Sequence, residues 1–211
     1  MQIRLQWETP KSWVAAAAEE TVALLADHAH CELKAAASAQ ALLIKHCEDQ
    51  PLVEALGHVA FEELEHFHRV SLLLHARGGV IGRSVSNPYA EGLRSGYSSR
   101  QGEVLLDRLI VSGLIEARSL ERFTLLAAEH PDGELRELYA ALLSSEASHR
   151  ALFQKLCAER YPEKRVEVRI RELCELEAHV ISSLDFAPRM HSGPPRTHET
   201  VDPSGLATQR A

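Results

Sequence analysis

Residues 52–70 have the sequence LVEALGHVAFEELEHFHRV, in which apolar residues recur in alternating steps of four and three. This spacing predicts a helix with one buried seam, and Glu63 and His66 stand in that seam where leucines are expected. Residues 135–156 repeat the pattern, with Glu146 and His149 in the middle of an otherwise apolar seam. A buried carboxylate is costly unless it is compensated, so these groups require one another or a cation.

Two other predicted helices carry a single carboxylate in the seam, Glu32 in one and Glu116 in the other. The midpoint between Glu32 and the first Glu-x-x-His pair falls in a turn at 48–51, and that between Glu116 and the second pair falls at 131–133. Each hairpin therefore brings its lone glutamate level with its own pair. The halves are offset by 84 residues at the lone glutamates and by 83 at the pairs, which indicates a duplicated helical hairpin.

The prolines divide the chain into helical segments, because proline inside a helix costs about 3 kcal/mol. The segment 78–102 is rich in glycine and serine and predicts a long crossover between the hairpins. The fold class is therefore all-α, a ferritin-like four-helix bundle with one long crossover and an additional C-terminal helix. Residues 1–187 form the bundle domain, and 188–211 form an irregular tail rich in Pro, Ser and Thr. The proline-free segments are 11–50, with a break near Asp27 left open, 52–87, 89–130, 132–161 and 163–187.

The composition is that of an ordinary globular chain, with 45% hydrophobic and 25% charged residues. The net charge of −7 argues against a globally basic nucleic-acid binder. No apolar run approaches the length of about 18 residues that a membrane-spanning helix requires. The four cysteines are far apart and form no C-x-x-C pair, which excludes a disulfide framework and favours reduced thiols. These features predict a cytoplasmic protein that contacts no membrane.

Four carboxylates and two imidazoles converging in a bundle core are typical of a di-iron or di-manganese site. Four negative charges balance two divalent ions, and glutamates can bridge both metals. Glu65 and His68 form a competing Glu-x-x-His pair, but Glu65 lies off the apolar seam. We interpret Glu62, Glu65 and His68 as solvated side chains or as residues that support the ligands. The predicted metal ligands are Glu32, Glu63, His66, Glu116, Glu146 and His149.

Other polar residues near the ligands have two interpretations. His28 lies one turn before Glu32 and is interpreted as a surface histidine, with a hydrogen bond inside the site as the alternative. Asp27 and Asp107 are weaker candidates for partners of the ligand histidines. The small residues serve either tight helix packing or space for O2 and substrate, and both alternatives remain open. These small residues are Ala35, Ala36, Ala39, Ser112 and Gly113.

The segments around the ligands resemble a family within the ferritin-like superfamily, the bacterial tRNA-(2-methylthio-N6-isopentenyladenosine) hydroxylases. The resemblance extends over residues 5–185. The Glu-x-x-His signature by itself indicates only the superfamily, and the resemblance to this family depends on the neighbouring residues. The segments are HCELKAA at 30–36, EELEHF at 62–67, IEARS at 115–119 and SEASHR at 145–150.

The resemblance implies a monooxygenase that hydroxylates the isopentenyl group of a modified adenosine next to the tRNA anticodon. It implies two iron ions, with manganese less favoured, held by the six residues given above. It also implies O2 as oxidant and an external electron donor, either a reductase or a ferredoxin-type protein, because the chain has no flavin or iron–sulfur motif.

Four other functions remain open on the sequence: a rubrerythrin-like peroxidase, a manganese catalase, an iron-storage protein and a metal-free structural bundle. The C-x-x-C rubredoxin module usual in the first is absent. Two segments are more basic than the rest of the chain: 77–108 has a net charge of +2 and 155–171 a net charge of +3. These excesses fit either an ordinary solvated surface or a contact with anticodon phosphates at the mouth of the site.

Overall fold

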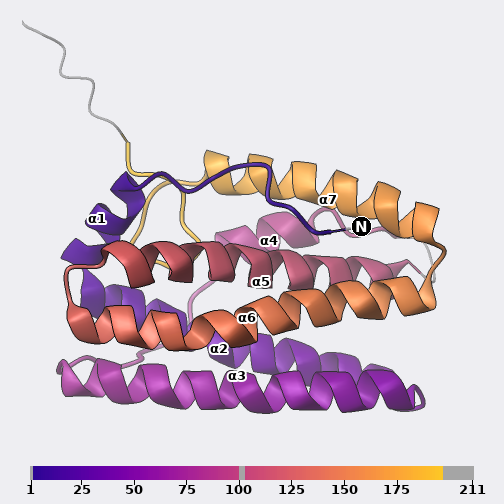
Figure 1. Cartoon of the computed structure of the whole chain (residues 1–211), viewed down its shortest axis with the longest axis horizontal. Coiled ribbons are helices and arrows are strands. Elements are labelled where there is room, and N and C mark those ends of the chain that lie inside the picture. Colours follow the sequence, from indigo (N-terminus) through magenta and orange to yellow (C-terminus); the bar gives the residue numbers. More distant parts are fainter. Residues whose placement is uncertain (1, 100–102, 197–211) are drawn as a thin grey trace, which may run out of the picture.

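The computed structural model describes residues 2–99 and 103–196, and this part of the chain contains helices and no strands. The four longest helices lie along the molecule and form two antiparallel hairpins (Figure 1). The predicted all-α ferritin-like fold is confirmed. The helices are α1 (Ser12–Glu19), α2 (Thr21–Lys45), α3 (Gln50–Ala76), α4 (Pro88–Arg94), α5 (Val104–Glu129), α6 (Gly133–Arg160) and α7 (Glu163–Ser183).

The first predicted helical segment is broken at Glu20, which separates α1 from α2. Asp27, where a break was left open, lies inside α2. The backbone of Glu20 leaves the helical region with φ −122° and ψ 47°, and no proline or glycine marks the place. The crossover also differs from a plain loop, because Asn87 caps α4 within it through a hydrogen bond from the Ala90 amide.

The two hairpins are related by the offset of 83 residues that the sequence predicts. Asp49 caps the N-terminus of α3 and Asp132 caps that of α6, each accepting hydrogen bonds from backbone amides. Arg160 donates to Asp49 at 2.7 and 2.9 Å, and Arg77 donates to Asp132 at 2.6 Å. Each N-cap aspartate is thus bound by an arginine at the end of the other hairpin. This pair of equivalent contacts supports a duplicated hairpin.

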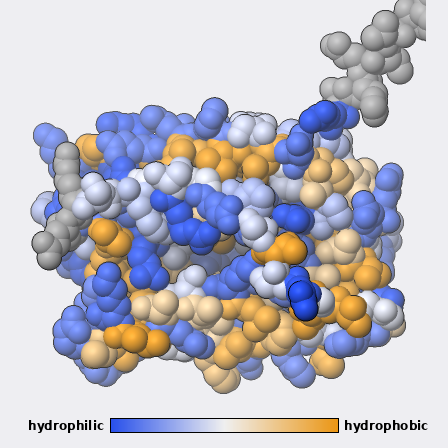
Figure 2. Space-filling model, turned by 180° about the vertical axis from the view of Figure 1, so that it is seen from behind, coloured by the Kyte–Doolittle hydropathy of each residue, from blue (hydrophilic) through white to orange (hydrophobic). Residues whose placement is uncertain are grey.

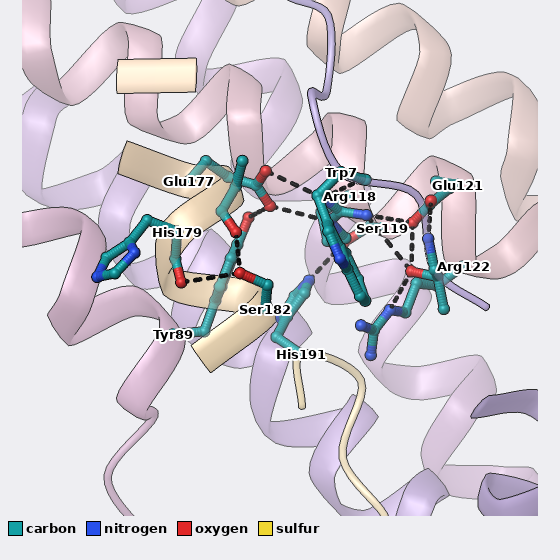
Figure 3. A network of polar contacts seen from close by, with 12 residues as sticks. Trp7, Tyr89, Arg118, Ser119, Glu121, Arg122, Glu177, His179, Ser182 and His191 are labelled. Atoms are coloured by element: carbon teal, nitrogen blue, oxygen red, sulfur yellow. Dashed lines mark hydrogen bonds and ion pairs between the residues drawn. The ribbon is translucent and has the colours of Figure 1, made fainter. Parts of the chain in front are cut away.

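Helix α7 covers the bundle on the side away from α2 and α3 (Figure 1). A buried ion pair holds it there: Arg118 of α5 donates to both carboxylate oxygens of Glu177 at 2.9 and 3.0 Å, and both side chains are fully buried (Figure 3). Tyr89 of α4 donates to Glu177 at 2.9 Å, and Arg118 also donates to the Trp7 carbonyl. Breaking such a pair leaves an uncompensated buried charge. One network therefore fixes α4, α5, α7 and the N-terminal segment.

The segment after α7 returns to the bundle, and its residues 190–192 are buried. Arg122 donates to the carbonyls of Met190 and Ser192 at 2.8 and 2.7 Å. Gly193 is required there, because a Cβ at this position would collide with the backbone of Leu184. The remaining predicted tail, 197–211, lies outside the described residues.

Candidate metal centre

The six predicted ligands come together at the middle of the bundle, one or two from each long helix. All six are buried, with between 1% and 5% of each residue exposed. Their potential ligand atoms form two groups within metal-binding distance of one another: Glu63, Glu116, Glu146 and His149 in one, and Glu32, Glu63 and His66 in the other. Glu63 belongs to both groups, as a bridging carboxylate would.

Each ligand histidine is oriented by a bond to its outer ring nitrogen. His149 Nε2 lies 2.8 Å from Glu62 Oε2, and a carboxylate can only accept, so Nε2 carries the proton. His66 Nε2 lies 3.1 Å from Ser145 Oγ, whose single proton is donated to the Leu142 carbonyl. Ser145 therefore accepts from His66. In both rings Nδ1 therefore faces the centre of the site.

Several buried atoms that face the centre have no hydrogen bond of good geometry, although His149 Nδ1 lies 2.9 Å from Glu63 Oε1. Four of them are His66 Nδ1, His149 Nδ1, Glu63 Oε1 and Glu146 Oε1. Unpaired buried polar atoms are rare in native proteins and require an explanation such as a bound ion. The donor set of carboxylates and imidazoles suits two divalent transition-metal ions. The residues present therefore fit a di-metal site.

Crowding of buried carboxylates perturbs the protonation of the site. Burial and the neighbouring glutamates raise the pKa of Glu32, Glu116 and Glu146 above the usual range of a glutamate. Burial by itself lowers the pKa of His149, but the carboxylates of Glu116 and Glu63 have the larger effect and raise it to about 11. Without a cation the site therefore retains protons near neutral pH. Metal ions supply the same positive charge and would displace those protons.

The structure places the competing residues away from the ligand positions. Glu65 and His68 are exposed, as predicted. Asp27 accepts from the Met190 amide, and Asp107 binds Arg169 and the Ser98 amide, so neither serves a ligand histidine. The carboxylate that binds a predicted ligand histidine is instead Glu62, which binds His149.

The preferred interpretation of His28 as a surface histidine is wrong, because its side chain is fully buried. Its Nε2 lies 2.5 Å from Glu32 Oε1, and its ring packs against Phe123 and Tyr139. Burial lowers the pKa of His28 to about 3, so the ring is neutral. The stacking of aromatic rings on this side fills the space beside Glu32 with side chains.

A cavity of about 670 Å³ reaches the site from the side of α4 and ends at Glu116. Its inner wall is apolar and includes Ala35, Ala39 and Phe153, with Ser112 one turn before Glu116. Of the small residues noted in the sequence, Ala35, Ala39 and Ser112 provide this space, whereas Gly113 lies against Ile3 and Phe153. Both interpretations of the small residues are thus realised, at different positions.

Basic side chains outnumber acidic ones in the outer part of the cavity. Lys34, Arg94 and Arg108 line it together with Glu91 and the partly buried Tyr97. Figure 2 shows the molecule from behind, with hydrophilic side chains over the middle of the face and groups of hydrophobic ones above and below them. Lys164 and Arg165 of α7 line a separate hollow with Glu103 and Glu172. Both basic segments of the sequence line this second hollow, but their basic side chains are divided: Arg94 and Arg108 line the first cavity, and Lys164 and Arg165 line the second. Arg100 lies outside the described residues.

Sequence comparison finds a match of residues 1–192 to the model of one family, tRNA-(MS2IO6A)-hydroxylase (MiaE). A tRNA 2-(methylsulfanyl)-N(6)-isopentenyladenosine(37) hydroxylase of Pseudomonas putida is 38% identical over 89% of this chain and 91% of its own length. The enzyme of the same name from Salmonella typhimurium is 31% identical, over 90% of this chain and 88% of its own.

Among solved structures, a match is Protein 43 with aldehyde deformylating oxygenase activity from Synechococcus. The TM-score is 0.86 and the identity 39%, with 92% of this chain and 98% of that one covered. The chain is therefore similar in fold and sequence to an oxygenase, and similar in sequence to the two tRNA hydroxylases. In the described part of the chain, no helix is long and apolar enough to cross a membrane.

Proposed function

Because this chain belongs to the tRNA-(MS2IO6A)-hydroxylase family, we propose that it hydroxylates the isopentenyl group of 2-methylthio-N6-isopentenyladenosine next to the tRNA anticodon. We further propose that the metals are two iron ions held by Glu32, Glu63, His66, Glu116, Glu146 and His149. Manganese is the less favoured alternative. The reaction takes O2 and electrons from an external reductase or ferredoxin-type donor, and it belongs in the cytoplasm, where tRNA is modified.

The single observation that carries the substrate assignment is the cavity ending at Glu116. Its apolar interior suits an isopentenyl group, which offers no hydrogen bonds and gains from leaving water. Its outer part suits a nucleotide, because Arg94 and Arg108 are cationic and Tyr97 offers an aromatic ring. Neither arginine forms an ion pair with another described residue, so both are available for phosphates.

The protein residues have distinct tasks in this proposal. Two bound iron ions supply the O2 chemistry, and the glutamates hold them with a near-neutral total charge. Ala35, Ala39 and Phe153 exclude water around the prenyl carbon that reacts. The rim residues Arg94 and Arg108 hold the nucleotide, so that the reacting carbon reaches the Glu116 side of the site.

The test is a reconstituted reaction. Iron-loaded protein, a chemical or enzymatic reductant and O2 are incubated with tRNA that carries the unhydroxylated nucleoside, and the nucleosides are then analysed by mass spectrometry. We expect the modified adenosine to gain one oxygen atom, and we expect a Glu146→Ala variant to leave it unchanged. A wild-type protein that binds two irons but leaves this nucleoside unchanged would refute the substrate assignment.

A fatty aldehyde is the second candidate substrate, because a structural relative with aldehyde deformylating oxygenase activity is 39% identical. The apolar cavity would accept an aliphatic chain as well as a prenyl group. The arginines at its mouth favour an anionic substrate over a neutral aldehyde. The same reductant and O2 mixture with a long-chain aldehyde decides between them: alkane formation at a rate above that of tRNA hydroxylation would reverse our assignment.

A further inference from the structure

The two histidines of the site have partners of different charge. His149 binds the carboxylate of Glu62, whereas His66 binds the hydroxyl of Ser145. Glu62 and Ser145 are separated by 83 residues, the same offset that relates His66 to His149. They occupy equivalent positions of the duplicated hairpin, immediately before Glu63 and Glu146. The hairpins are therefore alike in their ligand pairs and unlike at the residue that orients the histidine.

The difference is one of charge as well as shape. A carboxylate that accepts the Nε2 proton of an imidazole makes the opposite nitrogen a stronger donor, and a neutral hydroxyl does so to a smaller extent. Glu62 Oε2 also lies 3.0 Å from Nδ1 of His58, whose side chain is 70% exposed. This contact helps to hold the carboxylate against His149. Ser145 is held instead by its bond to the Leu142 carbonyl.

The cavity ends on the side of the site that carries the charged partner. It is lined by Glu116, which groups with His149, and Glu32, which groups with His66, does not line it. On the Glu32 side, the ring of His28 occupies the position one turn earlier. The equivalent position on the Glu116 side is Ser112, which lines the cavity. The asymmetry of the histidine partners thus coincides with the asymmetry of substrate access.

We propose that Glu62 is a positioning residue that makes the two metal positions unequal, so that the position of His149, beside the cavity, binds its metal more tightly than the position of His66. The inference rests on the proposed di-metal site. Loss of the outer partner of a metal-bound histidine typically lowers metal affinity by about 10- to 100-fold. The carboxylate at Glu62 accounts for an inequality of this size between the two positions.

Stepwise titration with Co²⁺ tests the proposal, with visible absorption and calorimetry reporting each equivalent. We expect the wild-type protein to bind two equivalents with constants that differ by about 10- to 100-fold. In Glu62→Ser, which reproduces the partner of His66, the tighter constant falls toward the weaker one. Glu62→Gln keeps the shape and an acceptor oxygen, and its tighter constant lies between those of the wild type and Glu62→Ser. Glu65→Gln, an exposed neighbour on the same helix, leaves both constants unchanged.

The reciprocal variant separates charge from structural damage. In Ser145→Glu the weaker constant rises toward the tighter one, and in the combined Glu62→Ser, Ser145→Glu variant the inequality returns. Circular dichroism establishes that each variant is folded. Two unequal constants in folded Glu62→Ser, identical to those of the wild type, would overturn the inference and leave the di-metal site intact. Failure of the wild-type protein to bind two equivalents would overturn the di-metal site itself.

Discussion

At the scale of residues, the centre of the molecule is a set of buried acids that cannot all be ionised without added positive charge. Glu32, Glu116 and Glu146 have raised pKa values because they are buried beside one another. His149 retains its proton among them, and the Nε2 bond to Glu62 leaves its Nδ1 directed at the centre. These buried acceptor atoms can bind cations, and when no cation is bound they destabilise the folded state.

Substitutions at the predicted ligand positions should lower the iron content, whereas substitutions at the neighbouring positions 65 and 68 should not. We expect Glu63→Ala, His66→Ala, Glu146→Ala and His149→Ala to lose at least one of about two irons per chain and all hydroxylation. Glu65→Ala and His68→Ala should retain both irons, because the two side chains are exposed. Metal analysis after anaerobic iron loading measures this. Iron lost from His68→Ala and kept by His66→Ala would show that the register of α3 is wrongly assigned.

Metal affinity should increase with pH. The carboxyl groups of Glu32, Glu116 and Glu146 have raised pKa values, and His149 has a raised pKa of about 11, so all four hold protons further into the alkaline range than usual. Each bound metal must displace such protons, and fewer remain as the pH rises. Co²⁺ titrations at about pH 6 and about pH 8 should give tighter binding at the higher pH. Equal affinities at the two pH values would contradict the inference that the metal-free site holds these protons.

The residue scale also separates what a sequence can predict from what it cannot. Glu63 and His66 were predictable because a polar residue inside an apolar seam stands out against a helical period. His28 was not, because its burial depends on Phe123 and Tyr139, which come from other helices. The same holds for Arg118 and Glu177, whose partnership across α5 and α7 leaves no periodic signal in either helix.

At the scale of elements, local capping residues determine where the helices begin, and contacts between residues distant in sequence stabilise their packing. Asp49 and Asp132 start α3 and α6, and their positions fit the turns predicted from the prolines. The break at Glu20 could not be located from the sequence, since no proline, glycine or capping side chain signals it, and the break left open near Asp27 does not occur. The segment after α7 has no helical pattern, and its burial could not be deduced from its composition. It nevertheless supplies His191 to the wall of the cavity.

Shortening the chain tests the importance of this segment. A chain that ends at residue 187 loses Met190 and Ser192, whose carbonyls bind the fully buried Arg122. Without them a buried guanidinium lacks two acceptors, and such losses destabilise proteins by about 1–3 kcal/mol each. We expect this chain to unfold at a clearly lower temperature than a matched chain ending at residue 196. Equal unfolding temperatures by calorimetry would show that the contacts of residues 188–196 add no stability.

At the scale of the whole molecule, the duplicated hairpins produce a centre with near two-fold symmetry, and the additions to them remove that symmetry. Helix α4 and the segment after α7 lie beside one half of the centre, where the cavity is found. The other half is closed by the stacked rings of His28 and Tyr139. The arrangement leaves the centre accessible from the side of Glu116.

Oxygen labelling tests the reaction that this arrangement would support. With ¹⁸O2 and ordinary water, we expect the hydroxyl group of the product to carry the label, because the oxygen atom comes from O2 in a monooxygenase reaction. The product mass measured by mass spectrometry reports the origin directly. A label that enters from H2¹⁸O and not from ¹⁸O2 would contradict oxygen insertion from O2.

The charge distribution predicts how an acidic protein holds an anionic substrate. The chain carries a net charge of −7, yet Arg94 and Arg108 line the cavity and form no ion pair with another described residue. Lys164 and Arg165 lie in another hollow, where Glu103 is 3.3 Å from Arg165 and offsets its charge. Phosphate binding therefore depends more on the first pair than on the second.

Paired charge reversals distinguish the two surfaces. We expect Arg94→Glu with Arg108→Glu to weaken tRNA binding and to make the slope of log affinity against log salt concentration shallower, because fewer phosphates release counterions. Lys164→Glu with Arg165→Glu, a change of equal charge, should have the smaller effect on both. Iron content should stay at the wild-type value in each, since none of the four residues belongs to the two groups of proposed ligands. If the reversal at the cavity leaves affinity and slope unchanged while the reversal on α7 lowers both, the tRNA approaches over α7, and the cavity mouth is not its phosphate contact.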